Sequence, residues 1–110
     1  HPAGDAVLKE LAELVGRQLR KLDILARYGG EEFMAILPET PLQGAVELAE
    51  RLRQNVEQHP FPYNGGDPLA ITVSVGVSSF PENKTKQELV DTADKALYRA
   101  KEGGRNRVES

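Results

Sequence analysis

The residues best suited to chemistry lie together in the segment Arg27–Phe33, which reads Arg-Tyr-Gly-Gly-Glu-Glu-Phe. Apolar residues flank it at 24–26 and 33–37, so the pattern predicts two strands joined by a Gly-Gly turn. Glycines let a backbone turn tightly and approach a ligand, and two carboxylates follow at once. The segment therefore predicts a hairpin tip that meets a metal-bound phosphate, because carboxylate oxygen suits a hard divalent cation.

The two carboxylates, Glu31 and Glu32, are adjacent at the start of the second predicted strand. Side chains of neighbouring strand residues point to opposite faces, so we expect one glutamate alone to face bound phosphates. The same residues also describe an ordinary surface hairpin with two solvated glutamates, since Gly-Gly is a common turn former. The hairpin by itself leaves both interpretations open.

Two further pairs of charged residues have plain structural explanations. Arg20 and Asp23 are three residues apart, and we interpret them as an ion pair across the last turn of a helix. Lys101 and Arg105 are one helical turn apart near a predicted helix end, where cations interact favourably with the helix C-terminus.

The chain predicts a mixed α and β domain. Asp5 is placed to cap a first helix, whose apolar residues recur at helical spacing from Val7 to Leu19. Thr40 with Gln43 predicts a capping box for a second helix, with Pro41 at its first position and its end near Gln58. Residues 59–68 predict a loop or a short irregular hairpin, because they are rich in proline and glycine.

The last part of the chain predicts a strand, a helix and an edge strand. Ile71 to Phe80 alternates between branched residues on one face and small or polar residues on the other. The branched face should pack on a helix, and Gly76 on the other face marks a close approach by a backbone or a ligand. Thr85 with Glu88 predicts a capping box, Gly103-Gly104 ends that helix, and 107–108 would form the edge strand.

Composition limits the class of protein. At 110 residues, with 39% hydrophobic and 28% charged residues, the chain is one ordinary globular domain. A net charge of −3 with interspersed signs argues against a nucleic-acid partner. The chain has no cysteine, which fits a reducing cytoplasm, and no apolar run of about 18 residues that would indicate membrane contact.

Four ordered motifs resemble one family along nearly the whole chain. The segment Arg27–Phe33 resembles the signature loop of GGDEF domains, the diguanylate cyclases, in its GGEEF variant. Three other stretches resemble the family's GHxxGD element, its RxxD element, and its closing helix with a GRN turn: residues 1–5, Arg20 to Asp23, and 93–101 followed by Gly104-Arg105-Asn106. Four motifs in the right order make the resemblance specific.

The resemblance implies a fold and an activity. The fold would be an α/β (α+β) sandwich of the nucleotide-cyclase type, with a mixed, mostly antiparallel sheet flanked by helices. The activity would be condensation of two GTP molecules to cyclic di-GMP with release of pyrophosphate, across a homodimer and with Mg²⁺ or Mn²⁺. An upstream sensory or regulatory domain and a cytoplasmic location are also implied.

The resemblance also assigns roles at the substrate site. Glu31 would hold the metal and take the proton of the attacking hydroxyl, with Glu32 sharing the metal or supporting the loop. Substrate contacts would come from a set that spans the chain: His1, Asp5, Gly29, Gly30, Lys101 and Arg105. Among these, the carboxylate of Asp5 would read the donor pair of guanine, and Lys101 and Arg105 would contact the triphosphate.

A second ligand site is implied by the RxxD element. In the family this element binds the product, cyclic di-GMP, and inhibits the enzyme. Arg20 and Asp23 would form that site here, with Arg51 of the second helix as an additional arginine. The planar guanidinium fork suits a phosphate or a guanine edge.

The resemblance finally implies elements before His1. In the family, a strand and a helix there carry a metal-binding aspartate and an asparagine that reads guanine. We therefore expect this chain to be the C-terminal portion of the domain, residues 1–110, and to be inactive alone. The alternative function is a degenerate domain that serves as a receptor for cyclic di-GMP or GTP.

Overall fold

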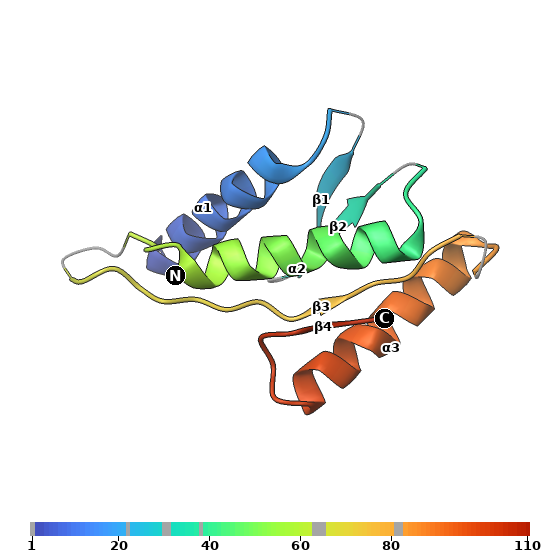
Figure 1. The fold of residues 1–110 in the computed structure, drawn as a ribbon. Helices are drawn as coiled ribbons and strands as arrows, with labels where there is room; N and C mark the ends of the chain where they lie inside the picture. The colour runs from blue at the N-terminus through green and yellow to red at the C-terminus, as the bar shows by residue number, and fades with distance from the viewer. Residues whose placement is uncertain (1, 22, 30–31, 38, 63–65, 81–82) are drawn as a thin grey trace.

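Helices and strands are interspersed along the chain in a computed structural model (Figure 1). The structure describes residues 2–21, 23–29, 32–37, 39–62, 66–80 and 83–110, with the side chains of 2–5, 25–29 and 32–34 left out. The helices are α1 (Pro2–Gln18), α2 (Leu42–Gln58) and α3 (Lys86–Glu102). The strands are β1 (Ile24–Gly29), β2 (Glu32–Ile36), β3 (Val75–Gly76) and β4 (Val108–Glu109).

The strands form two separate ladders within the described residues. β1 and β2 pair antiparallel, and β3 and β4 pair parallel. The predicted α+β class with strands of mixed direction is thus confirmed. In Figure 1, α2 lies between α1 and the β1–β2 hairpin on one side and the β3–β4 ladder with α3 on the other.

Helix α1 begins earlier than the sequence indicated. It starts at Pro2, so Asp5 lies inside the helix and the prediction that Asp5 caps it was wrong. Proline is tolerated in a first helical turn because that turn's N–H groups have no partner within the helix. The apolar stripe is confirmed, since Leu11 is buried and Val7, Leu14 and Val15 pack against its cluster.

Helix α2 lacks the predicted capping box. Its N-cap is Pro41, without a side-chain cap, and its first residue is Leu42. Thr40 therefore lies one residue too early to cap the helix, and its hydroxyl accepts a hydrogen bond from Arg20 Nη2 at 2.8 Å. The end of α2 at Gln58 is confirmed.

The core consists of two clusters that share helix α2. Val56 of α2 packs with Leu11 of α1 and Phe61, and Ile71 and Val73 lie against them. The second cluster contains buried residues of α2 and of the extended segment after it, namely Ala45, Ala49 and Val77. The branched face of the segment 71–77 thus packs on α2, as its alternation predicted.

The predicted long strand over 71–80 is reduced to two residues. Of the segment 71–80, which the structure describes throughout, only β3 pairs in a ladder. Val75 N and Val77 N donate to Arg107 O and Glu109 O, each at 2.9 Å. Strand assignment follows pairing, so a segment with an alternating face but one short neighbour counts as a short strand. The edge strand itself is confirmed at Val108–Glu109.

Helix α3 begins and ends as predicted. Thr85 Oγ1 accepts from Glu88 N at 3.0 Å, and Glu88 Oε1 accepts from Thr85 N at 3.1 Å, which completes the capping box. Gly103 is the C-cap, and Gly104 follows with a φ of 121° that favours glycine.

The other face of the extended segment lies against α3 at Gly76. A Cβ atom added there would come within 2.2 Å of Ala93 O and 2.4 Å of Leu97 N. Both atoms belong to the helix backbone, so the close approach predicted for Gly76 is confirmed and its occupant is α3.

We predict that Gly76→Ala lowers the free energy of unfolding by about 3 kcal/mol or more, because α3 must move to admit a methyl group. Gly16→Ala is the matched control, since a Cβ there meets nothing within 4 Å. That control should stabilise helix α1 by about 0.5 kcal/mol. Urea unfolding of both variants checks this, and equal stabilities would contradict the close packing at Gly76.

Candidate functional site

The β1–β2 hairpin pairs the first and last residues of the Gly-Gly-Glu-Glu stretch. Gly29 at the end of β1 pairs with Glu32 at the start of β2, and the register shifts between Arg27 and Gly29. The hairpin prediction is confirmed at the level of the backbone. Two residues join the strands, Gly30 and Glu31, and both lie outside the described residues, as does His1.

The ion pair between Arg20 and Asp23 is present but follows the helix. Helix α1 ends at Gln18, so the prediction that the pair spans its last turn was wrong. Arg20 N donates to Asp23 Oδ2 at 2.7 Å and Asp23 N donates to Arg20 O at 3.0 Å, so the pair closes the turn that leads into β1. The guanidinium adds a contact of 3.0 Å from Nη2 to Oδ1.

Mutual hydrogen bonding stabilises the charged forms of both side chains. Hydrogen bonds from Arg20 hold the pKa of Asp23 below its usual value, against an opposing effect of desolvation. The same hydrogen bond to Asp23 raises the pKa of Arg20. The Arg20 side chain remains 56% exposed while that of Asp23 is fully covered, so the cation of this pair faces solvent.

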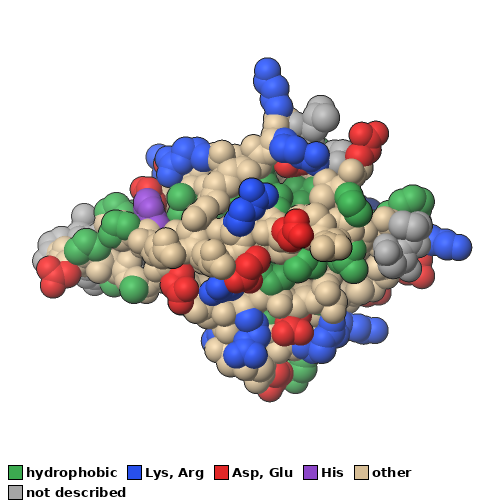
Figure 2. Space-filling view, viewed as in Figure 1, with side chains coloured by type: hydrophobic (Ala, Val, Ile, Leu, Met, Phe, Trp, Pro, Cys, Tyr) green, Lys and Arg blue, Asp and Glu red, His purple; other side chains and the backbone are tan. Residues whose placement is uncertain are grey.

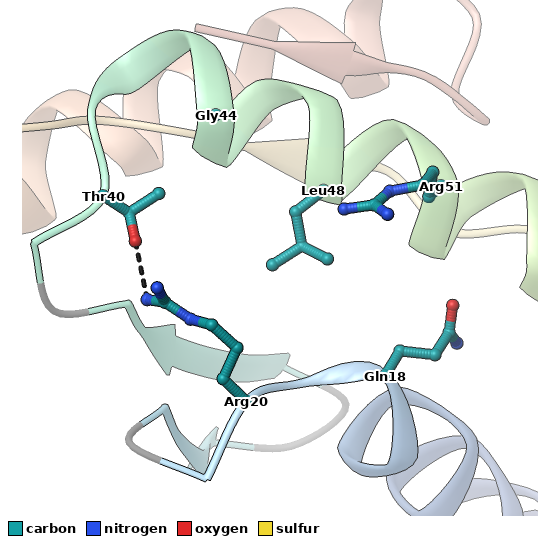
Figure 3. Close-up of a pocket in the computed structure, with 6 residues that line it drawn as sticks. All are labelled: Gln18, Arg20, Thr40, Gly44, Leu48 and Arg51. Atoms are coloured by element: carbon teal, nitrogen blue, oxygen red, sulfur yellow. Dashed lines mark hydrogen bonds between the residues drawn. The ribbon is translucent and has the colours of Figure 1, made fainter.

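A surface pocket, here called the Arg20 pocket, brings three chain segments together beside this cation. Its volume is about 350 Å³, within the usual range of ligand pockets of about 300–1,000 Å³. The lining comes from the end of α1, the turn before β1, and one side of α2 with the residue before its N-cap: Gln18, Arg20, Thr40, Gly44, Leu48 and Arg51. Figure 3 shows Arg20 reaching from the turn toward Thr40, with Leu48 and Arg51 on α2 across the pocket.

The Arg20 pocket has the chemistry of an anion site with an apolar wall. Arg20 and Arg51 supply two guanidinium groups, and Leu48 and Gly44 add apolar and open surface. The hydrogen bonds to Asp23 and Thr40 hold the Arg20 fork in one orientation before any ligand arrives. Arg20 and Arg51 both line this pocket and Asp23 is bound to Arg20, while their role as a ligand site stays a prediction.

Lys101 and Arg105, the proposed triphosphate contacts, do not line the Arg20 pocket. Lys101 belongs to the last turn of α3, as expected for a cation near a helix C-terminus. Arg105 follows the helix in a left-handed conformation with φ 64°, so the two cations lie on either side of the helix end at Gly103. Gly103 and Gly104 end the helix before Arg105 is reached.

Sequence reasoning missed several residues of the site. Thr40 was interpreted as a helix cap, although its hydroxyl orients Arg20. Gln18, Gly44 and Leu48 carry no motif, and they enter the pocket because α1 and α2 pack together there, where the Asn55 side chain donates to Gln18 Oε1. These three residues could have been identified from the sequence only by predicting which face of α2 packs against α1.

The described residues contain neither a metal cluster nor a membrane span. No group of three or more His, Asp or Glu side chains gathers among them, and Glu31 is not one of the residues searched. None of the helices in the described part of the chain has the length and apolarity to cross a bilayer. Figure 2 shows acidic and basic side chains interspersed on the face in view.

The chain matches the family model "Diguanylate cyclase, GGDEF domain" over residues 1–107. It is 46% identical to diguanylate cyclase DgcP of Pseudomonas aeruginosa, over 99% of this chain and 16% of that protein. It is 44% identical to diguanylate cyclase A of Treponema denticola, over 98% of this chain and 29% of that protein. The chain thus spans less than a third of either curated relative.

A solved structure agrees with these sequence matches. The GGDEF domain of DgcB from Caulobacter crescentus, in complex with c-di-GMP, superposes with a TM-score of 0.89 at 36% identity. The match covers 99% of this chain and 65% of that one. The chain therefore belongs to the GGDEF domain family of diguanylate cyclases, and its fold is that of the family.

We predict that Asp23→Asn destabilises the fold at neutral pH and that the deficit shrinks as the pH falls below about 4. The pKa of Asp23 is lowered in the folded state, so its contribution is present above the unfolded-state pKa and is lost as the pH falls through the folded-state pKa. Thermal melts across this pH range measure the effect.

Arg20→Ala and the double variant control for the pair. If the ion pair carries the effect, Asp23→Asn should cost little more once Arg20 is gone. A deficit of the same size at every pH would instead assign the loss to the shape of the turn.

Proposed function

We propose that this chain is the C-terminal portion of the catalytic domain of a diguanylate cyclase that condenses two GTP molecules to cyclic di-GMP. The observation that supports the proposal is the β1–β2 hairpin, in which Gly29 pairs with Glu32, the two ends of the Gly-Gly-Glu-Glu stretch, in a domain of this family. A tip with two glycines and two carboxylates combines close backbone approach with oxygen ligands.

The hairpin tip fits a divalent cation in its donor chemistry. Glu31 and Glu32 would hold Mg²⁺ or Mn²⁺ through carboxylate oxygen, which both ions prefer. A bound ion of this kind supplies positive charge at the α-phosphate and favours ionisation of the attacking hydroxyl. Glu31 would accept the proton of that hydroxyl.

The remaining substrate contacts would orient GTP. The carboxylate of Asp5 would accept hydrogen bonds from the ring N–H and the exocyclic amine of guanine, a donor pair that adenine lacks on that edge. Gly29 and Gly30 would let the backbone pass the nucleotide, and His1 would contact it. Lys101 and Arg105 would bind the triphosphate as cations.

The reaction is a double condensation across a homodimer. Each subunit would present one GTP, and the 3′-hydroxyl of each nucleotide would attack the α-phosphorus of the other. Each attack forms one phosphodiester bond and breaks the bond to the β-phosphate, so two GTP yield one cyclic di-GMP and two pyrophosphates. The protein supplies position and charge, as phosphoryl transfer generally requires.

The Arg20 pocket would bind the product and inhibit the enzyme. Two guanidinium groups face one cavity there, and the orientation of Arg20 is set in advance by Asp23 and Thr40. Cyclic di-GMP offers phosphates and guanine edges that match these groups. A regulatory domain elsewhere in the parent protein would set the activity, and the GTP supply implies a cytoplasmic location.

We predict that Glu31→Gln in the full-length protein that carries this chain lowers turnover of GTP by about 100-fold or more. The amide removes a metal-binding charge and a proton acceptor without changing side-chain size. Release of pyrophosphate and formation of cyclic di-GMP measure the rate.

Thermal stability is the control for that variant and should stay unchanged, since the substitution removes no core packing. Turnover within about threefold of the parent would refute the role of Glu31. If neither parent nor variant forms product while both bind cyclic di-GMP, the domain is a receptor and not an enzyme.

We predict that Arg20→Ala weakens cyclic di-GMP binding by about 1.5–3 kcal/mol, the range for a hydrogen bond to a charged group. Isothermal titration calorimetry on the two proteins measures the difference. Arg17→Ala is the matched control, because it removes the same charge from the exposed last turn of α1 outside the pocket. Equal losses in both variants would show a long-range charge effect only.

A further inference from the structure

The side chain of Asn106 bridges two residues of helix α2. Asn106 Oδ1 accepts from Arg53 Nη1 at 2.8 Å, and Asn106 Nδ2 donates to Glu57 Oε2 at 2.6 Å. One carboxamide thus meets a cationic donor and an anionic acceptor at once. Arg53 and Glu57 lie four residues apart on one face of the helix, so their spacing matches the two ends of the amide.

Arg53 is itself held in place by acidic neighbours. Its Nε donates to Glu50 Oε1 at 3.0 Å, and its Nη1 lies 3.5 Å from Glu57 Oε1. The Arg53 side chain is only 15% exposed, so it is an anchored group and not a solvated one. Hydrogen bonds from Arg53 also hold the pKa of Glu50 below its usual value, which keeps that carboxylate charged.

The backbone that carries Asn106 has positive φ angles at three successive residues. Gly104, Arg105 and Asn106 have φ values of 121°, 64° and 46°. Asparagine tolerates the left-handed region, but arginine rarely enters it, and such residues persist when their surroundings hold them there. Arg105 N donates to Ala100 O at 2.9 Å, and Asn106 N donates to Ser74 Oγ at 3.1 Å.

Backbone and side-chain hydrogen bonds together therefore explain how Arg105 keeps its position. Hydrogen bonds that the turn donates to carbonyl oxygens of the preceding helix fix it on one side, and the Asn106 amide ties it to α2 on the other. Arg105 lies between these two attachments and is exposed. Without the Asn106 amide, the attachment to the α2 side chains is lost.

We propose that Asn106, Arg53 and Glu57 are positioning residues that hold Arg105 toward the triphosphate of GTP. This inference rests on the proposed function, in which Arg105 is a triphosphate contact. None of the three touches substrate; they act by fixing the backbone turn from which Arg105 projects.

Asn106→Gly separates the amide from the backbone conformation. Glycine accepts a positive φ at no steric cost, so the variant removes the bridge to α2 while the turn stays sterically accessible. In the full-length protein we expect KM for GTP to rise about tenfold. In an Arg105→Ala background the same substitution should change KM less than about twofold, because the group that it positions is gone.

A swap of hydrogen-bonding polarity gives an independent test. Asn106→Asp puts a carboxylate against Glu57 and should raise KM, whereas Glu57→Gln alone keeps an amide oxygen that can accept from Asn106 Nδ2 and should change KM little. The double variant restores one donor to one acceptor and should return KM to within about threefold of the parent. Glu47→Gln is the control, since it removes the same charge from an exposed position of α2.

Hydrogen exchange supplies a readout that needs no activity. Exchange of the Arg105 and Asn106 amides should quicken about tenfold in Asn106→Gly and recover in the double polarity variant. Unchanged exchange in Asn106→Gly, or a double variant no better than Asn106→Asp, would overturn the positioning role. If Arg105→Ala leaves KM unchanged, the proposed triphosphate contact fails, while exchange still decides whether the bridge holds the turn.

Discussion

The packing of both faces of the extended segment 71–79 is the constraint on which the rest of the structure depends. Its branched residues fill the two core clusters against α2, and its opposite face admits the backbone of α3 at Gly76. A segment covered on both sides has little freedom to shift, since protein interiors are close-packed. Helix α3 and the β3–β4 ladder are therefore placed by one glycine and one row of branched side chains.

Helix α2 connects this core to both candidate sites. One end of the helix packs small residues, Ala45 and Ala49, against Val77, and the other buries Val56 against Phe61. Its remaining surface carries Arg51 in the Arg20 pocket and, two residues later, Arg53 in the bridge to Asn106. The same helix therefore contributes an arginine that lines a pocket and an arginine that is held by side-chain partners, and their neighbours distinguish them. Arg53 is surrounded by carboxylates and an amide, whereas Arg51 faces an open pocket.

Electrostatic preorganisation is common to both sites. At the Arg20 pocket a covered carboxylate and a hydroxyl fix the orientation of an exposed guanidinium. At the turn after α3 an anchored guanidinium and a carboxylate fix an amide, and through it the backbone of Arg105. In each case the ordering is completed in the free protein, so binding an anion costs less conformational entropy.

Local chemistry determined much of this protein from sequence alone. The capping box at Thr85, the glycine end of α3, the hairpin around Gly29 and the ion pair of Arg20 with Asp23 all depend on residues within a few positions of one another. The family could also be recognised from the sequence, because its motifs are short and follow one another in order along the chain. Alternation further predicted that Gly76 is approached closely, although the pattern could not say whether by a backbone or by a ligand.

Only the tertiary structure decided where local groups find distant partners. Thr40 was equally able to cap α2 or to meet Arg20, and the packing of α1 and the turn against α2 selected Arg20. The segment 71–80 has strand character throughout, but its pairing depends on where β4 arrives and thus covers two residues. Asn106 gave no local sign of a bridge, since Arg53 lies more than fifty positions earlier. Hydrogen bonds across such separations follow from the relative placement of whole helices, which no local pattern encodes.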